Sequence, residues 1–188
     1  MRIDLIHTAR LTLLPASPED VQAALAGPEA LAAQLQAAVP ADWPHEYLDE
    51  AALRLFHEHA DSDSGRRGWW LRFILLREDN GNRRLIGSTG YKGPPDADNS
   101  VEIGYGIVAG ARRQGYATEA ARGLVRSAFQ LPEVSTVVAS TLPYLVESIG
   151  VLCRSGFRQV GGSQDGRIVR YALSREHAVA LGYARSAA

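Results

Sequence analysis

The segment "ARRQGYATE", residues 111–119, holds the residue types best suited to bind an anion. It lies between a β-branched run and an alanine-rich run with helical spacing, where a helix is expected to begin. A helix start leaves four backbone N–H groups without partners and carries about half a positive charge. Gly115 lets a ligand approach the backbone and tolerates a positive φ. Arg112 and Arg113 add positive charge, and Thr118 adds a hydroxyl, so the segment predicts a cradle for a phosphorylated cofactor.

Two other glycine-rich motifs do not fit this region. A P-loop requires Gly-x-x-x-x-Gly-Lys-Ser/Thr, and no lysine follows a glycine in that frame. A dinucleotide fingerprint is suggested by Gly104, Gly106 and Gly110, but their spacing is wrong. The next expected strand, "VSTVVAST", also ends without an Asp or Glu to bind a ribose hydroxyl. A nicotinamide-dependent enzyme stays an alternative with little support from the spacing.

Three segments together resemble a known family. Arg112-x-x-Gly115-x-Ala117 is similar to the (Gln/Arg)-x-x-Gly-x-(Gly/Ala) pyrophosphate motif of the GNAT family of acetyl-CoA-dependent N-acetyltransferases. "VEIGYGI" before it and "GYATEAARGLV" after it resemble the RimJ- and RimL-like branch, which acetylates ribosomal-protein N-termini. "SIGVLCRSGF" is similar to the second motif of that branch. The resemblance extends from Arg10 to Ser174 and is specific for the cofactor class rather than for the acceptor.

The resemblance implies where acetyl-CoA would bind. In this family the fourth strand carries a bulge and splays from the fifth, and pantetheine lies in the gap like an added strand. That strand is "VEIGYGIV" here, and its Gly104 and Gly106 suit a bulge or serve packing alone. Ile107 and Val108 are expected to contact pantetheine through main-chain groups. The pyrophosphate is expected to be held by Arg112, Arg113, Gln114, Gly115, Tyr116, Ala117 and Thr118.

The resemblance also suggests two catalytic residues. Glu102 is the candidate base, acting through water, although a lone strand carboxylate is also a common surface charge. Ser148 matches a serine that can hydrogen-bond the cofactor sulfur, although it could simply cap a helix. Leu145 replaces the usual asparagine of this branch, and Leu152 is at the position where other branches carry a tyrosine that acts as the general acid. The proton donor to the thiolate is then Ser148, water or the substrate.

The acceptor site is expected near the segment "VPADWPHEY". Family members use this helix–loop region as one wall of that site, so Trp43 and Tyr47 are candidate acceptor contacts. Packing of Trp43 in the core is an equally good interpretation. No metal site is expected, because His57 and His59 are two residues apart on a helix and point to different sides.

The elements that must position these residues follow from periodicity and turn signals. Ser17-Pro18 predicts a helix cap after a short strand, and "DNGN" predicts a hairpin turn. The expected order is β, several α, three β, α, β, α, β, β, as a single α/β (α+β) domain over residues 1–188. Its sheet is expected to be mixed and mostly antiparallel, flanked by helices, with a core over 10–174 and a tail over 175–188. The expected segments are "RLTLLPAS", "YLDEAALRLFHEHA", "WWLRFILLRE", "RLIGSTGYKG", "VEIGYGIV", the helix Tyr116 to Phe129, "VSTVVAST", the helix Val146 to Ser155, "GFRQVGG" and "RIVRYALS".

Composition bounds the remaining possibilities. The formal charge of −1 over 188 residues gives no basic field, so nucleic acid is not an expected partner. No run approaches the ~18 apolar residues of a membrane span, and the opening lacks a signal-peptide core. The single cysteine, Cys153, cannot form an internal disulfide. These features predict a cytoplasmic protein, a monomer or homodimer, without membrane attachment.

The function expected from the sequence is direct transfer of an acetyl group from acetyl-CoA to a primary amine. The acceptor would be a protein N-terminus or a small-molecule amine. A non-catalytic acyl-CoA-binding module of the same fold is the alternative within the family.

Overall fold

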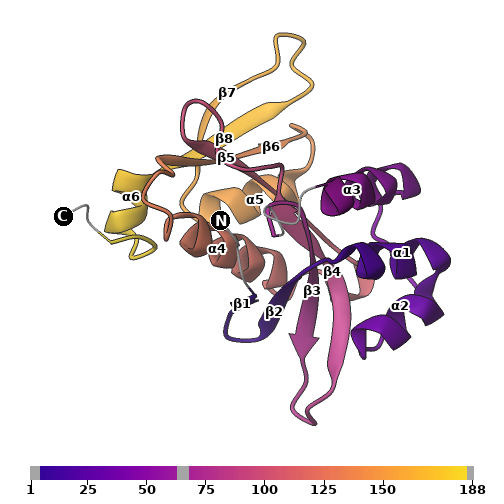
Figure 1. Cartoon of the computed structure of the whole chain (residues 1–188). Helices are drawn as coiled ribbons and strands as arrows, with labels where there is room; N and C mark the ends of the chain where they lie inside the picture. The colour runs from indigo at the N-terminus through magenta and orange to yellow at the C-terminus, as the bar shows by residue number, and fades with distance from the viewer. Residues whose placement is uncertain (1–4, 63–67, 186–188) are drawn as a thin grey trace.

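A computed structural model gives the fold for residues 5–62 and 68–185. Within these ranges, eight strands form one sheet in the order β1-β2-β3-β4-β5-β6-β8-β7 (Figure 1). Every neighbouring pair is antiparallel except β5 with β6, which is parallel. The predicted mixed, mostly antiparallel sheet is therefore confirmed. The strands are β1 (Ile6–His7), β2 (Leu11–Pro15), β3 (Leu71–Arg77), β4 (Arg83–Tyr91), β5 (Ser100–Ile107), β6 (Thr136–Thr141), β7 (Arg158–Gly162) and β8 (Val169–Ser174).

Helices fill the connections that the sequence predicted to be helical. The first of them begins at a capping box, in which Ser17 N–H donates to Asp20 Oδ2 (2.9 Å) and Asp20 N–H donates to Ser17 Oγ (3.2 Å). The side chain of His59 lies outside the described part of the chain. The helices are α1 (Pro18–Ala26), α2 (Pro28–Leu35), α3 (Glu50–Ser62), α4 (Tyr116–Ala128), α5 (Val146–Arg154) and α6 (Arg175–Ala180), with a 3₁₀ turn, η2 (Ala109–Ala111).

Helix α6 lies where the sequence predicted only a tail. Ser174 caps it by accepting a hydrogen bond from His177 N–H (3.2 Å), and Ala178 is fully buried. Arg175 donates to the carbonyl oxygens of Phe129 (3.1 Å) and Val134 (2.9 Å), which follow α4. These long-range contacts hold the segment in place, and they leave no local signal in the sequence.

The two faces of β5 contact different layers of the molecule. On one face, Tyr91 of β4 donates its hydroxyl to Leu124 O in α4 (2.7 Å), and Tyr105 of β5 reaches Ser148 in α5. On the other face, His45 lies so close to Gly106 that a Cβ there would come within 2.2 Å of its ring. In Figure 1, α1, α2 and α3 group together, apart from α4 and α5. Strand β5 therefore lies between α4 and α5 on one side and residues 42–47, the 42–47 loop, on the other.

Strands β5 and β6 diverge after a short pairing. Only Ser100, Val101 and Glu102 pair with β6, opposite residues 136–138. Strand β5 then continues along β4 to Ile107, while β6 continues to Thr141 beside β8. The central strands are therefore splayed.

The expected bulge is not in β5. Residues 103–107 pair with β4 in unbroken register, and the register shift lies instead between β3 and β4, at Ile74/Leu75. The expectation was wrong because glycine in a strand can also serve to let another group approach the backbone closely. Gly106 leaves space for His45, and a Cβ on Gly87 would come within 2.1 Å of Gly106 O.

Trp43 belongs to the hydrophobic core. Its side chain is 7% exposed, and its ring meets Phe73 of β3 edge to face, with centroids 5.7 Å apart. Tyr47, four residues later, is 55% exposed. Of the two aromatic residues expected at the acceptor site, one is therefore buried and one is accessible.

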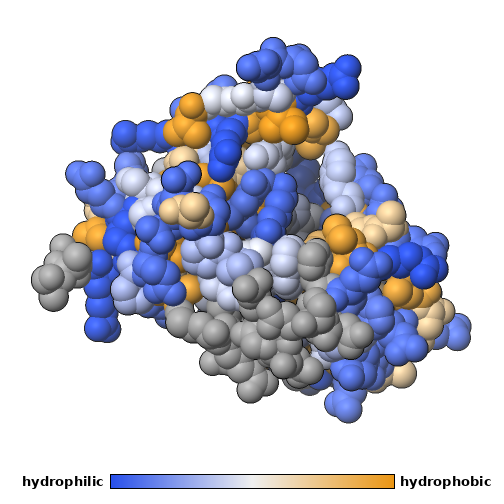
Figure 2. Space-filling view, turned by 45° about the horizontal axis from the view of Figure 1, so that its top comes forward, coloured by the Kyte–Doolittle hydropathy of each residue, from blue (hydrophilic) through white to orange (hydrophobic). Residues whose placement is uncertain are grey.

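The surface of the molecule is mostly hydrophilic on the face drawn in Figure 2. Hydrophobic residues gather there over the β7–β8 end, where Val160 and Ile168 are exposed. Among the described helices, none is long and apolar enough to cross a lipid bilayer.

Replacement of Trp43 by alanine tests its place in the core. Trp43→Ala should lower the free energy of unfolding by about 3–5 kcal/mol, because it leaves a cavity against Phe73. Tyr47→Ala, at an exposed position, is the matched control and should change the free energy of unfolding by no more than about 0.5 kcal/mol. Urea denaturation measures both. A Trp43→Ala variant of undiminished stability would return this residue to the acceptor site.

Candidate active site

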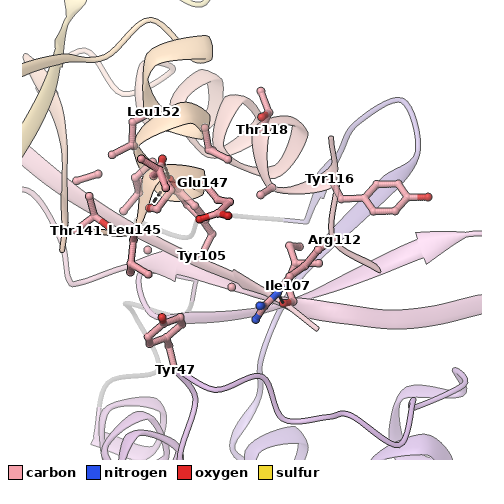
Figure 3. Close-up of a pocket in the computed structure, with 18 of the residues that line it drawn as sticks. Tyr47, Tyr105, Ile107, Arg112, Tyr116, Thr118, Thr141, Leu145, Glu147 and Leu152 are labelled. Atoms are coloured by element: carbon pink, nitrogen blue, oxygen red, sulfur yellow. Dashed lines mark hydrogen bonds between the residues drawn. The ribbon is translucent and has the colours of Figure 1, made fainter. Parts of the chain in front are cut away.

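A cleft of about 1040 Å³ opens in the gap between β5 and β6. Its walls are β5, the end of β6, the starts of α4 and α5, and the 42–47 loop (Figure 3). Its size is that of a site for a cofactor-sized ligand. The sequence-predicted residues that line it are Tyr47, Ile107, Arg112, Arg113, Gly115, Tyr116, Ala117, Thr118 and Ser148. Those outside its lining are Trp43, Glu102, Val108 and Gln114.

The turn before α4 has the backbone shape of an anion cradle. Gly115 is the N-cap with φ 82°, and no side chain caps this helix. Arg113 is also left-handed, with φ 63°, a conformation that costs a non-glycine residue roughly 1–3 kcal/mol. Alternating left-handed residues turn successive N–H groups toward one point, which favours a bound anion. The geometry therefore fits the predicted phosphate site.

An acidic residue beside this cradle is neutralised within the protein. Glu119, in the first turn of α4, accepts hydrogen bonds from Thr8 Oγ1 (2.6 Å), Arg10 N (2.7 Å) and Arg10 Nε (2.8 Å). Burial favours a raised pKa, but these hydrogen bonds outweigh it and lower the pKa of Glu119. The Arg10 guanidinium also lies 4.4 Å from the centroid of the Tyr116 ring. The role of Arg10 leaves no local pattern in the sequence, because more than a hundred residues separate it from Glu119.

Arg112 connects the cradle to the 42–47 loop. Its Nε donates to Ile107 O (3.0 Å), and its Nη2 donates to Glu46 Oε1 (2.9 Å). Gly110 N–H, in the same turn, donates to Asp42 Oδ2 (2.8 Å). The loop and the cradle are thus held together by an ion pair and a backbone hydrogen bond.

The pleat of β5 decides which main-chain groups face the gap. Lys92 N–H donates to Glu102 O (2.8 Å), and Val108 N–H donates to Ile86 O (3.0 Å). Even-numbered residues of β5 therefore turn their polar groups toward β4, and Tyr105 and Ile107 turn theirs toward the gap.

The expectation for Val108 is corrected by this alternation. Its N–H is bound by Ile86 O, and its C=O accepts from Ala111 N–H (3.0 Å). Both of its main-chain groups are therefore paired inside the protein. Tyr105, two residues before Ile107, turns its main-chain groups to the same edge as Ile107, whereas Val108 does not.

Two hydroxyl groups meet at the α5 wall of the cleft. Tyr105 Oη lies 3.3 Å from Ser148 Oγ and donates to Ser148 O (3.2 Å). Burial raises the pKa of Tyr105 to about 12, so its hydroxyl stays protonated at neutral pH. Leu152 is buried at this wall, and Leu145 begins α5 without a side-chain cap. Tyr105 thus brings to this wall the hydroxyl that Leu152 lacks.

Glu102 lies at the edge of the cleft rather than in its lining. Its carboxylate forms an ion pair with Lys92 Nζ (2.5 Å), and Lys92 itself lines the cleft. The role of Glu102 as a base acting through water stays a prediction.

The 42–47 loop carries Tyr47 to the side of β5 opposite Thr118 and Leu152 (Figure 3). His45 fixes the loop: its Nδ1 accepts from Tyr47 N–H (3.3 Å), so its Nε2 carries the proton and donates to Ser88 Oγ (2.7 Å). Burial, helped by the positive charge of Arg112, lowers the pKa of His45 to about 4. The imidazole is therefore neutral at pH 7 and serves as an anchor.

Comparison with known proteins agrees with this arrangement. A region of 100 residues is 33% identical to the uncharacterized N-acetyltransferase YjdG of Bacillus subtilis (strain 168), and spans 52% of this chain and 56% of that protein. The chain thus spans about half the length of this curated relative.

Solved structures share the fold. RimJ of Mycobacterium smegmatis in complex with CoA-disulfide superposes with a TM-score of 0.62 at 20% identity, over 96% of this chain and 95% of that one. RimL, a ribosomal L7/L12 alpha-N-protein acetyltransferase in complex with coenzyme A, superposes with a TM-score of 0.61 at 18% identity, over 91% and 98%. Residues 10–158 match the acetyltransferase (GNAT) domain, and the chain therefore belongs to that family.

Proposed function

We propose that the protein is an acetyl-CoA-dependent N-acetyltransferase that moves the acetyl group directly to a primary amine. The observation that carries this proposal is the junction of two features: the gap between β5 and β6 runs directly into the uncapped, left-handed start of α4. One ligand with an extended amide arm and a diphosphate would satisfy both. Acetyl-CoA has these two parts.

The wall residues have distinct tasks in binding acetyl-CoA. The diphosphate would accept hydrogen bonds from the first-turn N–H groups of α4 and from Arg113. The pantetheine amides would pair with the main-chain groups that Tyr105 turns toward the gap and with Ile107 N–H, as an added strand does, since Ile107 O already accepts a hydrogen bond from Arg112 Nε. Ion pairing of Glu119 with Arg10 keeps that carboxylate from repelling the diphosphate.

The transfer step is a direct nucleophilic substitution at the thioester. The neutral amine nitrogen forms a bond to the acetyl carbon, and the carbon–sulfur bond breaks after a tetrahedral intermediate. The nitrogen loses one proton, and the CoA thiolate gains one. The hydroxyls of Ser148 and Tyr105 are the groups at the α5 wall that could stabilise and protonate the thiolate.

The acceptor is a primary amine, either a protein N-terminus or a small molecule. Resemblance to RimL, which is named for alpha-N-protein acetylation, favours the N-terminus. The exposed Tyr47 and Tyr144 leave the acceptor side accessible, which suits a chain terminus as well as a free amine.

A screen of amines tests this function. Peptides with free N-termini, polyamines and amino acids are incubated with acetyl-CoA, and release of the CoA thiol is measured. We expect release to depend on both substrates. A protein that binds acetyl-CoA in calorimetry but releases thiol with none of these amines is a binding module, and the enzymatic proposal is then wrong.

Substitution of Gly115 tests the phosphate site. Gly115→Glu should weaken acetyl-CoA binding by roughly 10²-fold, because a carboxylate would stand beside the diphosphate. Gly115→Ala is the matched control: it carries the same strain at φ 82°, about 1–2 kcal/mol, without the charge. Calorimetry measures affinity, and thermal melting verifies the fold. Equal affinities for the two variants would contradict the assignment.

Removal of the hydroxyl pair tests the leaving-group step. Ser148→Ala should lower kcat by about 10²-fold, a usual contribution of a proton donor, with little change in acetyl-CoA affinity. Tyr105→Phe loses one hydrogen bond to Ser148 and should lower kcat by about tenfold. Steady-state kinetics at saturating acetyl-CoA measures both. Unchanged kcat in Ser148→Ala would leave Ser148 a purely structural first-turn residue.

A further inference from the structure

The 42–47 loop is attached to the acetyl-CoA side of the cleft at three points. Asp42 accepts from Gly110 N–H (2.8 Å), the His45 ring lies against Gly106, and Glu46 pairs with Arg112 (2.9 Å). The first contact joins a backbone N–H to the exposed Asp42 side chain, and the second involves the buried His45 ring. The third is an ion pair between exposed side chains, 55% and 45% accessible, and is therefore the easiest of the three to exchange.

Glu46 has the position of an acceptor-binding group. Among the described residues, the carboxylates that line the cleft are Glu46 and Glu147. Glu147 belongs to the first turn of α5 and lies on the same side of β5 as Leu152 (Figure 3). Glu46 belongs to the loop on the other side, next to Tyr47. It thus belongs to the Tyr47 side of the cleft and meets the expected diphosphate site at Arg112.

Tyr47 lies beside the Glu46 carboxylate. The pKa of Tyr47 is raised by desolvation, then by the charges of Glu46 and Tyr144 and by a hydrogen bond to Glu46. Tyr47 therefore lies within electrostatic reach of both Glu46 and Tyr144. A carboxylate beside a tyrosine ring attracts an organic ammonium group through charge and cation–π interaction.

Arg112 has two competing anionic partners if acetyl-CoA binds as proposed. It is the first residue of the phosphate-binding turn, yet in this structure its Nη2 is bound to Glu46. An exposed arginine–carboxylate pair is worth only about 0–1 kcal/mol. A diphosphate carries more charge and accepts bidentate hydrogen bonds from arginine, so it can displace the carboxylate.

We propose that Glu46 is the residue that binds the ammonium group of the acceptor, and that Arg112 holds it until acetyl-CoA takes over the guanidinium. This inference rests on the proposed function, because it assigns a role within the same site. Acetyl-CoA binding then frees the Glu46 carboxylate to bind the ammonium group beside a loaded thioester. That ammonium group must give up one proton before its nitrogen attacks the acetyl carbon, as the transfer step requires. Affinity for the acceptor is thereby coupled to occupation of the acetyl-CoA site.

A double-mutant cycle on coenzyme A binding tests the exchange without an acceptor. Glu46→Gln should tighten binding of CoA by about two- to fivefold, because Arg112 no longer has to leave a carboxylate. Arg112→Gln removes the ion pair and keeps a residue type that the motif accepts. In that background, Glu46→Gln should leave the affinity unchanged within error.

Glu50→Gln is the matched control for loss of one negative charge. Glu50 is exposed and pairs with Arg54 outside the cleft, so its removal should not change CoA affinity in either background. Isothermal calorimetry at 0.15 M salt measures all variants. The exchange is overturned if Glu46→Gln leaves CoA binding unchanged or weaker in the protein that keeps Arg112. It is also overturned if Glu46→Gln tightens CoA binding equally in the Arg112→Gln protein.

Kinetics with an amine found in the screen tests ammonium binding. At saturating acetyl-CoA, Glu46→Gln should raise KM for the amine at least about tenfold, with a smaller effect on kcat. Glu46→Asp should raise KM less than Glu46→Gln does, because it keeps the carboxylate. Glu50→Gln should leave KM unchanged. Wild-type KM in Glu46→Gln overturns the assignment. Failure of wild-type protein to bind CoA, or to use any amine, would instead overturn the proposed function, so the two failures are distinguishable.

Discussion

The divergence of β5 from β6 after Glu102 is the constraint on which the rest of the structure depends. Backbone N–H and C=O groups need partners, and β4 supplies them on one edge of β5 only. On the other edge, Tyr105 and Ile107 turn their polar groups into a gap. An unpaired strand edge of this kind is stable in a folded protein when it faces solvent or a ligand and when other elements pack on both faces of the strand. Helices α4 and α5 hold one face of β5, and the 42–47 loop holds the other, so the layers converge on the cleft.

Charge compensation around the cleft follows from this convergence. The helix dipole of α4 and two arginines give its start a positive potential, which Glu119 would weaken if it were free. Arg10 and Thr8 bind that carboxylate from the β1–β2 turn instead. On the opposite side, Glu46 balances Arg112. The Glu119 side chain is 16% exposed and accepts three hydrogen bonds, whereas the Glu46 side chain is 55% exposed and forms an ion pair with Arg112. The first pair is therefore the better-fixed part of the fold, and the second is the one that we propose responds to a ligand.

The sequence predicted those features whose causes are local. Ser17 caps α1 and Gly115 starts α4 as expected, because a cap and a left-handed turn are set by a few neighbouring residues. Features decided by tertiary contacts were missed or misplaced. Composition could not tell buried Trp43 from exposed Tyr47, since only the packing against Phe73 distinguishes them. Tyr105, which lies between two glycines, was not predicted to line the site. Alternation along a strand was a usable signal, because it puts Tyr105 and Ile107 on the same side and turns the main-chain groups of Val108 the other way.

The difference between locally determined features and features that depend on tertiary contacts also explains why the motifs indicate a cofactor but no acceptor. Most residues expected to bind acetyl-CoA lie in one continuous stretch within 105–118, so that part of the site can be read as a pattern. The proposed acceptor side combines the 42–47 loop with the turn at Tyr144, about a hundred residues away, and only the fold brings the two segments together. Arg112 belongs to the first side and contacts the second through Glu46. Selection for an acceptor can therefore act on the 42–47 loop while the strand–turn–helix unit stays constant, and Arg112 is the boundary residue to which our proposal gives a role on both sides.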